Sequence, residues 1–185
     1  VTEFPQEQAL VQQAQWDIAN SFLTQARVVD VFSATLARGQ YVRAAKELQR
    51  LADEYYDHPK IDTIPQMLWE ISNELANRRY YDEAIIVWND LTIRYPTHKL
   101  ALDAALSIAR TYQNNLQQPL RAAEAYQEVN IARGGNDAEM QNAIYQIGIQ
   151  LKNKKRWVEA LHVLEMFVDS FPRHPQAGQA LTMIG

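Results

Sequence analysis

A short segment recurs along this chain: a large residue, two variable residues and then an alanine. Three copies begin with an aromatic residue and a weaker copy begins with proline, at residues 41–44, 81–84, 157–160 and 119–122. The anchor alanines are Ala44, Ala84, Ala122 and Ala160, so successive copies follow one another at nearly equal intervals. A period of roughly 20–50 residues is the signature of a solenoid built from one repeated supersecondary unit. The repeat therefore constrains the fold more strongly than any other feature of the sequence.

Each copy begins an amphipathic helix. Four residues after each alanine comes a large apolar residue, namely Leu48, Trp88, Tyr126 and Leu164. Three residues later comes another, namely Leu51, Leu91, Val129 and Phe167. These offsets place both series on one helical face. Two copies end at Tyr95-Pro96 and Phe171-Pro172, where proline stops the helix.

A second helix precedes each of the last three copies and carries a small residue on its apolar face. These small residues are Ser72, Ala109 and Gly148. A bulky side chain at such a site would overpack the neighbouring helix, at a cost of about 1–3 kcal/mol. Each unit is thus a helical hairpin, helix A followed by helix B, and hairpins must stack to bury their apolar faces. The predicted helices span residues 41–56, 64–77, 81–95, 99–115, 119–132, 137–153, 157–171 and 174–185.

The N-terminal part departs from this register. Residues 6–38 contain neither glycine nor proline, so either one helix of about 30 residues or two helices meeting near residues 24–26 would fit. We favour a long or kinked helix, because two helices would give the wrong alternation of A and B. The expected domains are residues 1–40, as the remainder of an upstream repeat, and residues 41–185, as repeats of which the last is truncated. Because the chain starts at Val1 and ends within a helical pattern, we expect a fragment of a longer protein.

Composition and motifs disfavour several functional classes. The formal net charge of −4 lacks the basic excess of nucleic-acid binders. The absence of cysteine excludes disulfides, thiol catalysis and cysteine-bound zinc, and no apolar run approaches the roughly 20 residues of a membrane span. His162 and Glu165 share a helical face, but two ligands without a third make a poor metal site. We therefore expect no enzymatic activity, no cofactor or metal, no nucleic-acid partner and no transmembrane segment.

The small residue of helix A, the alanine of helix B, the aromatic residue before it and the proline after it resemble the tetratricopeptide repeat (TPR) family. The resemblance covers residues 27–185 and is strongest over 64–185. It implies an all-α, right-handed superhelical solenoid whose concave face, lined by helices A, binds a polypeptide partner. The chain departs from the family in its period, 38–40 residues rather than about 34, and in large residues at the second helix-B alanine.

Long repeats with aromatic–proline endings resemble bacterial envelope members of the family. These include the lipoprotein of the outer-membrane β-barrel assembly machine and the periplasmic coordinator of the Tol-Pal system. The resemblance implies a scaffold in the periplasm or cell envelope. Because cytosolic members share these endings, a cytoplasmic location stays open. The alternative function is a structural spacer, or a segment that self-associates through its terminal helices, without a peptide ligand.

The resemblance also implies which residues line the concave face. In the hairpin that begins at residue 64 they are Gln66, Trp69, Glu70, Asn73 and Asn77. In the next hairpin they are Asp103, Ser107, Arg110 and Gln113, and in the last they are Asn142, Tyr145, Gln146, Lys152 and Asn153. Amides, Arg, Trp and Tyr suit an extended peptide. The alternative is that these side chains are simply solvated or that neighbouring helices fill the groove.

Two recurring polar features lie in the turns. His58, His98 and His174 follow helix-B ends at equivalent positions, and we expect them to cap C-terminal carbonyl groups. Residues 152–156 form a basic run between helix A and helix B, which is either a patch for an acidic partner or anionic lipid, or a solvated loop.

Overall fold

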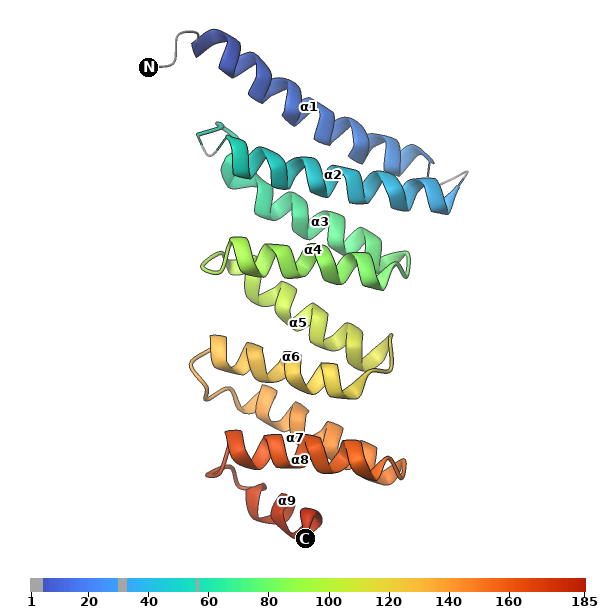
Figure 1. Cartoon of the computed structure of the whole chain (residues 1–185), viewed down its shortest axis with the longest axis vertical. Coiled ribbons are helices and arrows are strands. Elements are labelled where there is room, and N and C mark those ends of the chain that lie inside the picture. Colours follow the sequence, from blue (N-terminus) through green and yellow to red (C-terminus); the bar gives the residue numbers. More distant parts are fainter. Residues whose placement is uncertain (1–4, 30–32, 56) are drawn as a thin grey trace. The chain divides into compact units, whose positions relative to one another are not determined.

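Figure 1 shows the computed structural model of the chain, which describes residues 5–29, 33–55 and 57–185. Within these residues all regular secondary structure is helical, with nine α-helices, one short 3-10 helix and no strand. The expectation of an all-α fold is confirmed. The contacts divide the chain into unit 1, Val1–Ala101, and unit 2, Leu102–Gly185.

Unit 1 contains two helical hairpins. Its helices are α1 (Pro5–Val29), α2 (Ala34–Glu54), the 3-10 helix η1 (Ile61–Thr63), α3 (Ile64–Asn77) and α4 (Tyr81–Arg94). Helix α1 packs against α2, α2 against α3, and α3 against α4. Consecutive helices run in opposite directions (Figure 1). The predicted limits of α3 are confirmed, and those of α4 are confirmed to within one residue.

Unit 2 continues the same alternation. The division falls in the first turn of α5 (Lys99–Asn114), which is followed by α6 (Pro119–Ala132), α7 (Ala138–Asn153), α8 (Trp157–Ser170) and α9 (Ala177–Ile184). Helix α7 packs against α6 and α8, and α8 packs against α9. Helix α8 also contacts α6, so it lies in the groove between α6 and α7.

The repeated residues form the core of both units. All four anchor alanines are buried, as are both series of large apolar residues that follow them in helices B. The small residues of helices A are buried as well: Ser72 and Ala109 are fully buried, and Gly148 lies against Leu164 of α8. The prediction that a small residue lets paired helices approach closely is confirmed at Gly148, and Ser72 and Ala109 are buried as that prediction requires.

The expectation of one long or kinked helix over residues 6–38 is wrong. Helix α1 ends at Val29 and α2 begins at Ala34, with Ser33 as its N-cap; residues 30–32 lie outside the described part of the chain. The Ser33 hydroxyl accepts a hydrogen bond from the Leu36 amide at 3.4 Å, which supplies a partner for a free N–H of the first turn. A capping side chain, rather than glycine or proline, thus starts a new helix. Residue 40, the expected domain limit, lies inside α2.

The turns between helix A and helix B share one backbone feature in three hairpins, a residue with positive φ. Arg79, Gln117 and Lys155, which occupy equivalent positions in successive repeats, have φ angles of 65°, 56° and 60°. In the first and last turns, Tyr80 N–H donates to Leu75 O and Arg156 N–H donates to Leu151 O. A residue in the left-handed conformation commonly terminates a helix, and that residue is usually glycine. Here Arg79, Gln117 and Lys155 take this role at the ends of helices A. Because none is glycine or asparagine, the sequence does not indicate the conformation.

Candidate functional site

The face of α3 carries five of the residues predicted to bind a partner. Gln66 and Glu70 are exposed and pair with each other, with Gln66 Nε2 donating to Glu70 Oε1 at 3.0 Å. Trp69 is half-buried, and its ring lies 6.4 Å from that of Trp88 on α4. Asn73 is half-buried, and Asn77 is exposed. Helix α3 thus presents amide groups beside one partly accessible tryptophan.

Helix α5 carries four predicted residues, of which Asp103 and Arg110 are exposed and Ser107 and Gln113 are half-buried. Three of them already have partners within unit 2, and Ser107 Oγ donates to the backbone carbonyl of Asp103 at 2.8 Å. Gln113 Oε1 accepts a hydrogen bond from Tyr126 Oη at 3.0 Å. Arg110 and Glu139 face each other at 4.0 Å, with both side chains largely exposed. A pair of that length and exposure contributes little to stability, so Arg110 is accessible to a ligand.

Helix α7 carries the last five, and Tyr145 differs from expectation. Asn142, Gln146 and Asn153 are exposed and Lys152 is half-buried. Tyr145 is only 4% exposed. Its ring lies 5.3 Å from that of Phe167, and its hydroxyl donates to Gln179 Oε1 on α9 at 2.9 Å. The expectation that this side chain points outward is wrong, because α9 covers it.

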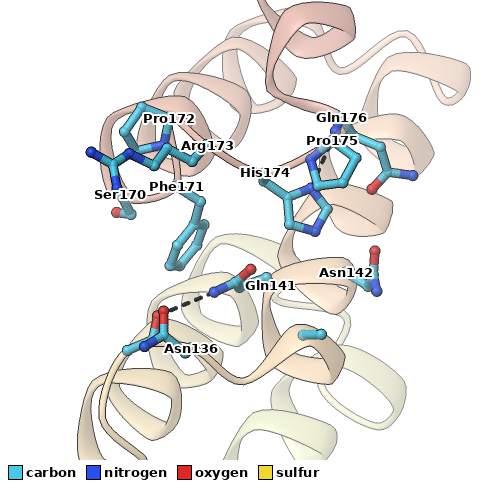
Figure 2. Close-up of a pocket in the computed structure, with 12 residues that line it drawn as sticks. Asn136, Gln141, Asn142, Ser170, Phe171, Pro172, Arg173, His174, Pro175 and Gln176 are labelled. Carbon is cyan, nitrogen blue, oxygen red and sulfur yellow. Dashed lines mark hydrogen bonds between the residues drawn. The ribbon is translucent and has the colours of Figure 1, made fainter.

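A notch of about 630 Å³ lies in unit 2 between the start of α7 and the turn that follows α8. We call it the α7 notch; it is lined by Gly135, Asn136, Ala138, Gln141 and Asn142, and by residues 170–176. Figure 2 shows the side chains of Phe171 and His174 pointing from that turn toward the start of α7. Gln141 Nε2 donates to Gly135 O at 3.1 Å and ties the rim to the turn after α6.

A similar notch recurs in unit 1, two repeats earlier in the chain. It measures about 460 Å³ and is lined by Ile61, Asp62, Pro65 and residues 94–98. Tyr95, Pro96 and His98 stand where the α7 notch has Phe171, Pro172 and His174. The notch is therefore a property of the repeat, and its chemistry is set by the variable residues around it.

The two notches differ in charge. In unit 1 the guanidinium of Arg94 is bound by the carboxylates of Asp53 and Asp90, and Asp62 also lines the wall. In the α7 notch the only charged lining residue among those described is Arg173, which is exposed and has no acidic partner there. An unpaired guanidinium in a notch without carboxylates favours a ligand that carries negative charge.

Two neutral side chains of the α7 notch are also free to bind a ligand. Within the described residues, the side chains of Asn136 and Asn142 have no hydrogen-bond partner, and Oε1 of Gln176 is buried and unpaired. Ser170 differs, because its hydroxyl accepts a hydrogen bond from Gln127 at 2.6 Å. Oε1 of Gln176 is an unsatisfied acceptor with almost no accessible surface, so the neutral groups that a ligand can reach directly are the exposed amides of Asn136 and Asn142.

The recurring histidines act at the start of the next helix. Nδ1 of His58, His98 and His174 accepts the backbone N–H two residues later, at 3.1, 3.2 and 3.3 Å. The expectation that the rings cap C-terminal carbonyls is therefore wrong, because each ring nitrogen is the acceptor. The backbone N–H of each histidine instead donates to the carbonyl of the aromatic residue three positions earlier. The rings of His98 and His174 thus fix the path of the chain through the unit 1 notch and the α7 notch.

One buried side chain that shapes the α7 notch was not predicted. Asn130 is 1% exposed, and its Oδ1 accepts a hydrogen bond from the Asp137 amide at 2.9 Å. Asp137 caps α7 by accepting from the amides of Glu139 and Met140, while Arg133 beside it lowers the pKa of its carboxyl. The signal in the sequence was weak, since an asparagine near a helix end usually indicates a solvated cap.

Other kinds of site find no support in the described residues. No three His, Asp or Glu side chains in them come together to hold a metal ion. None of the helices described is long and apolar enough to cross a membrane. Comparison with protein-family models and with curated proteins found no match to this chain.

Proposed function

We propose that this chain is a polypeptide-binding scaffold of the TPR type. The observation that carries the proposal is the α7 notch, where Arg173, Asn136 and Asn142 have no internal partner beside the buried ring of Phe171. The notch combines an apolar floor with a few polar groups, as ligand sites do. Side-chain amides can both donate to and accept from a peptide backbone.

The notch lies at the end of the helix-A face that carries the other predicted residues of α7. Asn142 belongs to both, and Gln146 follows it one turn later on the exposed side of the helix. An extended peptide that enters the notch can therefore continue along α7. In this proposal the helices A line the concave face of a superhelix, and Arg110 supplies a further contact within unit 2. A periplasmic or cell-envelope location is part of the proposal and rests on the aromatic–proline endings alone.

Selection from a random-peptide display library tests the proposal. The purified chain is immobilised, enriched peptides are synthesised, and each is titrated against the wild type by fluorescence anisotropy. We expect the peptides to share acidic residues, and expect Arg173→Ala with Asn142→Ala to weaken binding by about tenfold or more.

A matched control uses the same residue types at exposed positions of unit 1, as Arg27→Ala with Asn89→Ala. This variant should bind as the wild type does. A third variant, Arg110→Ala with Gln146→Ala, tests whether contacts extend beyond the notch within unit 2. Failure to enrich any peptide, or equal affinity of the notch and control variants, would contradict the proposal.

A second candidate function is a self-associating spacer, favoured by an exposed apolar stripe on α1. Leu10, Val11 and Ile18 are 71%, 48% and 45% exposed. Such a stripe on a helix at the end of a unit is typical of an interface. Sedimentation at increasing concentration tests it: self-association should raise the mass, and Leu10→Glu with Ile18→Glu should restore the monomer. A constant monomer mass would exclude this candidate.

A further inference from the structure

The unit 1 notch lies between the turn that follows α4 and the start of α3, and it stays open although the chain continues beyond it into α5. Its volume of about 460 Å³ falls within the range of small-ligand pockets, about 300–1,000 Å³. All of its lining residues belong to unit 1, with α1 and α2 before them in the chain. The helices on either side of it in the sequence therefore leave the notch unfilled.

The charged groups at this notch are mostly acidic. Asp62 is exposed, and within the described residues its carboxylate has no hydrogen bond and no ion pair. Arg94 lines the notch as well, but its guanidinium is held by the carboxylates of Asp53 and Asp90. One guanidinium thus stands beside three carboxylates, and the carboxylate of Asp62 is the one left without a partner. A cationic ligand suits such a notch.

Two lysines adjoin the lining residues in the sequence, and neither of them lines the notch. Nζ of Lys60 lies 4.8 Å from the centre of the Trp16 ring on α1, and Lys99 is exposed at the start of α5. In the part of the chain that the structure describes, no three His, Asp or Glu side chains come together to hold a metal ion. The free carboxylate therefore points to an organic cation, such as a basic side chain.

Unit 1 already holds two of its own arginines with one combination of groups, a carboxylate and the face of a tyrosine ring. The guanidinium of Arg38 pairs with Glu83 and lies 5.5 Å from the centre of the Tyr80 ring. The guanidinium of Arg78 pairs with the glutamate one helical turn earlier and lies 5.1 Å from the centre of the Tyr41 ring. A guanidinium is attracted both to a carboxylate and to an aromatic face.

The unit 1 notch offers the same two groups without an arginine. Asp62 supplies the free carboxylate, and Tyr95 supplies a half-buried ring that has no cation over it within the described residues. Ile61 and Pro65 add apolar walls. Such walls keep water away from a bound ion pair and so strengthen its attraction.

We propose that the unit 1 notch binds an arginine side chain of a separate polypeptide, whose guanidinium pairs with the carboxylate of Asp62 and stacks on the ring of Tyr95. Because the α7 notch favours an acidic ligand, the two notches select side chains of opposite charge. This site does not depend on the function proposed for the α7 notch.

The test uses a fluorescein-labelled nonapeptide with capped ends, in which three arginines alternate with glycine and serine, titrated against the full chain by fluorescence anisotropy. We expect saturable binding, weakened about fivefold or more by Asp62→Asn and about tenfold or more by Asp62→Lys. Tyr95→Leu should weaken it about threefold or more. A peptide with citrulline in place of arginine keeps the shape without the charge, and it should bind about fivefold more weakly or worse.

Asp82→Asn is the matched control, because Asp82 is an exposed aspartate of unit 1 outside the notch and has no partner within the described residues. It should bind as the wild type does, and so should Arg173→Ala, which separates this site from the α7 notch. Circular dichroism of each variant shows whether the fold is retained. In amide NMR spectra, the shifts caused by the peptide should cluster at residues 61–64 and 94–98.

Absence of binding would overturn the proposal. Equal loss of affinity in Asp62→Asn and Asp82→Asn would also overturn it, since the peptide would then respond only to the net charge of the chain. Undiminished binding of the citrulline peptide, or shifts that cluster away from the notch, would overturn it as well.

Discussion

A Cβ atom placed on Gly148 would lie 2.7 Å from Cδ2 and 2.9 Å from Cγ of Leu164. The pair joins helix A to helix B of one hairpin, at the small and large positions that define the repeat. Real Cβ atoms do not approach neighbours so closely, so α7 and α8 can pack as they do only because residue 148 lacks a side chain. This contact therefore favours a residue without a side chain at position 148.

Gly148→Ala should lower the free energy of unfolding by about 1–2 kcal/mol. Overpacking costs about 1–3 kcal/mol, and the better helix propensity of alanine returns up to about 1 kcal/mol. Leu164→Ala removes the clash, so the double variant should be more stable than the sum of the two single changes predicts, by about 1 kcal/mol or more. Urea unfolding, followed by circular dichroism, measures the free energy of unfolding of the two single variants and of the double variant. Strictly additive changes in the free energy of unfolding would show that position 148 is not in contact with the side chain of residue 164.

His98→Leu should destabilise the chain by about 0.5–2 kcal/mol, because it removes the acceptor for the Leu100 amide. His98→Asn keeps a side-chain acceptor and should cost less. His162→Leu is the control, since His162 is exposed on α8, and its thermal midpoint should match the wild type. If all three variants melt alike, the ring of His98 is not a cap.

Stability should depend on pH through His58, which is 3% exposed and stacks on Trp16. Burial, followed by the charge of Lys60, lowers the pKa of His58, while Asp57 opposes the shift. The unfolded chain therefore binds a proton more readily, so the free energy of unfolding should fall as the pH drops below about 6.5. The contribution is fully present above that pH and is lost as the pH reaches the lower pKa of the folded state.

His58→Gln should flatten this dependence in urea titrations performed between about pH 7 and pH 5, whereas the exposed-site control His162→Gln should keep it. An unchanged slope in His58→Gln would mean that other groups cause the loss of stability.

Asn130→Ala should cost about 1–3 kcal/mol, because it leaves the Asp137 amide without its partner and opens a space in a buried site. Asn142→Ala removes the same side chain from an exposed position and should change stability by less than about 0.5 kcal/mol. Hydrogen exchange at the Asp137 amide, faster in Asn130→Ala alone, gives a direct readout. Equal protection in both variants would contradict the assignment.

Arg79→Gly should stabilise the chain by about 0.5–1 kcal/mol, because residue 79 has a φ of 65° that glycine adopts without strain. Ala76→Gly, three residues earlier inside α3, should destabilise it by about 0.5–1 kcal/mol through lost helix propensity. Thermal unfolding should show a higher midpoint for Arg79→Gly and a lower midpoint for Ala76→Gly. A loss of stability in Arg79→Gly would contradict backbone strain at this turn.

The sequence predicted the helices from residue 64 onward closely, because each hairpin repeats the same pairing of small and large apolar residues. The positions of Ala84 and Phe167 contribute to the core in every copy of the repeat, and both residues are buried in the structure. The signal is redundant, so an error in one copy is corrected by the next.

Features outside that pattern were harder to predict. The start of α2 depends on one hydroxyl of Ser33, and a serine can equally well occur within a helix. Tyr145 has the amphipathic character of a surface residue, and only its contact with α9 decides that it is buried. The buried side chain of Asn130 is polar because it accepts a hydrogen bond from the backbone amide of Asp137, further along the chain.

The candidate site was predicted only in part. The helix-A positions could be read from periodicity, and most of them are accessible in the structure. The α7 notch could not be predicted from periodicity, because it is formed jointly by the start of α7 and by residues 170–176. Its distinguishing property is an arginine, Arg173, without an acidic partner, whereas the arginine that lines the unit 1 notch, Arg94, is neutralised by two aspartates; this difference appears only when the partners of each charge are known.

Amide NMR spectra of the chain, recorded with and without a library-selected acidic peptide, test the central claim most directly. The account predicts that the shifted resonances cluster at Asn136, Asn142 and residues 170–176 and continue along the exposed side of α7, and that Arg173→Ala reduces these shifts. Shifts confined to other helices, or spectra that do not change at saturating peptide, would contradict polypeptide binding at this surface.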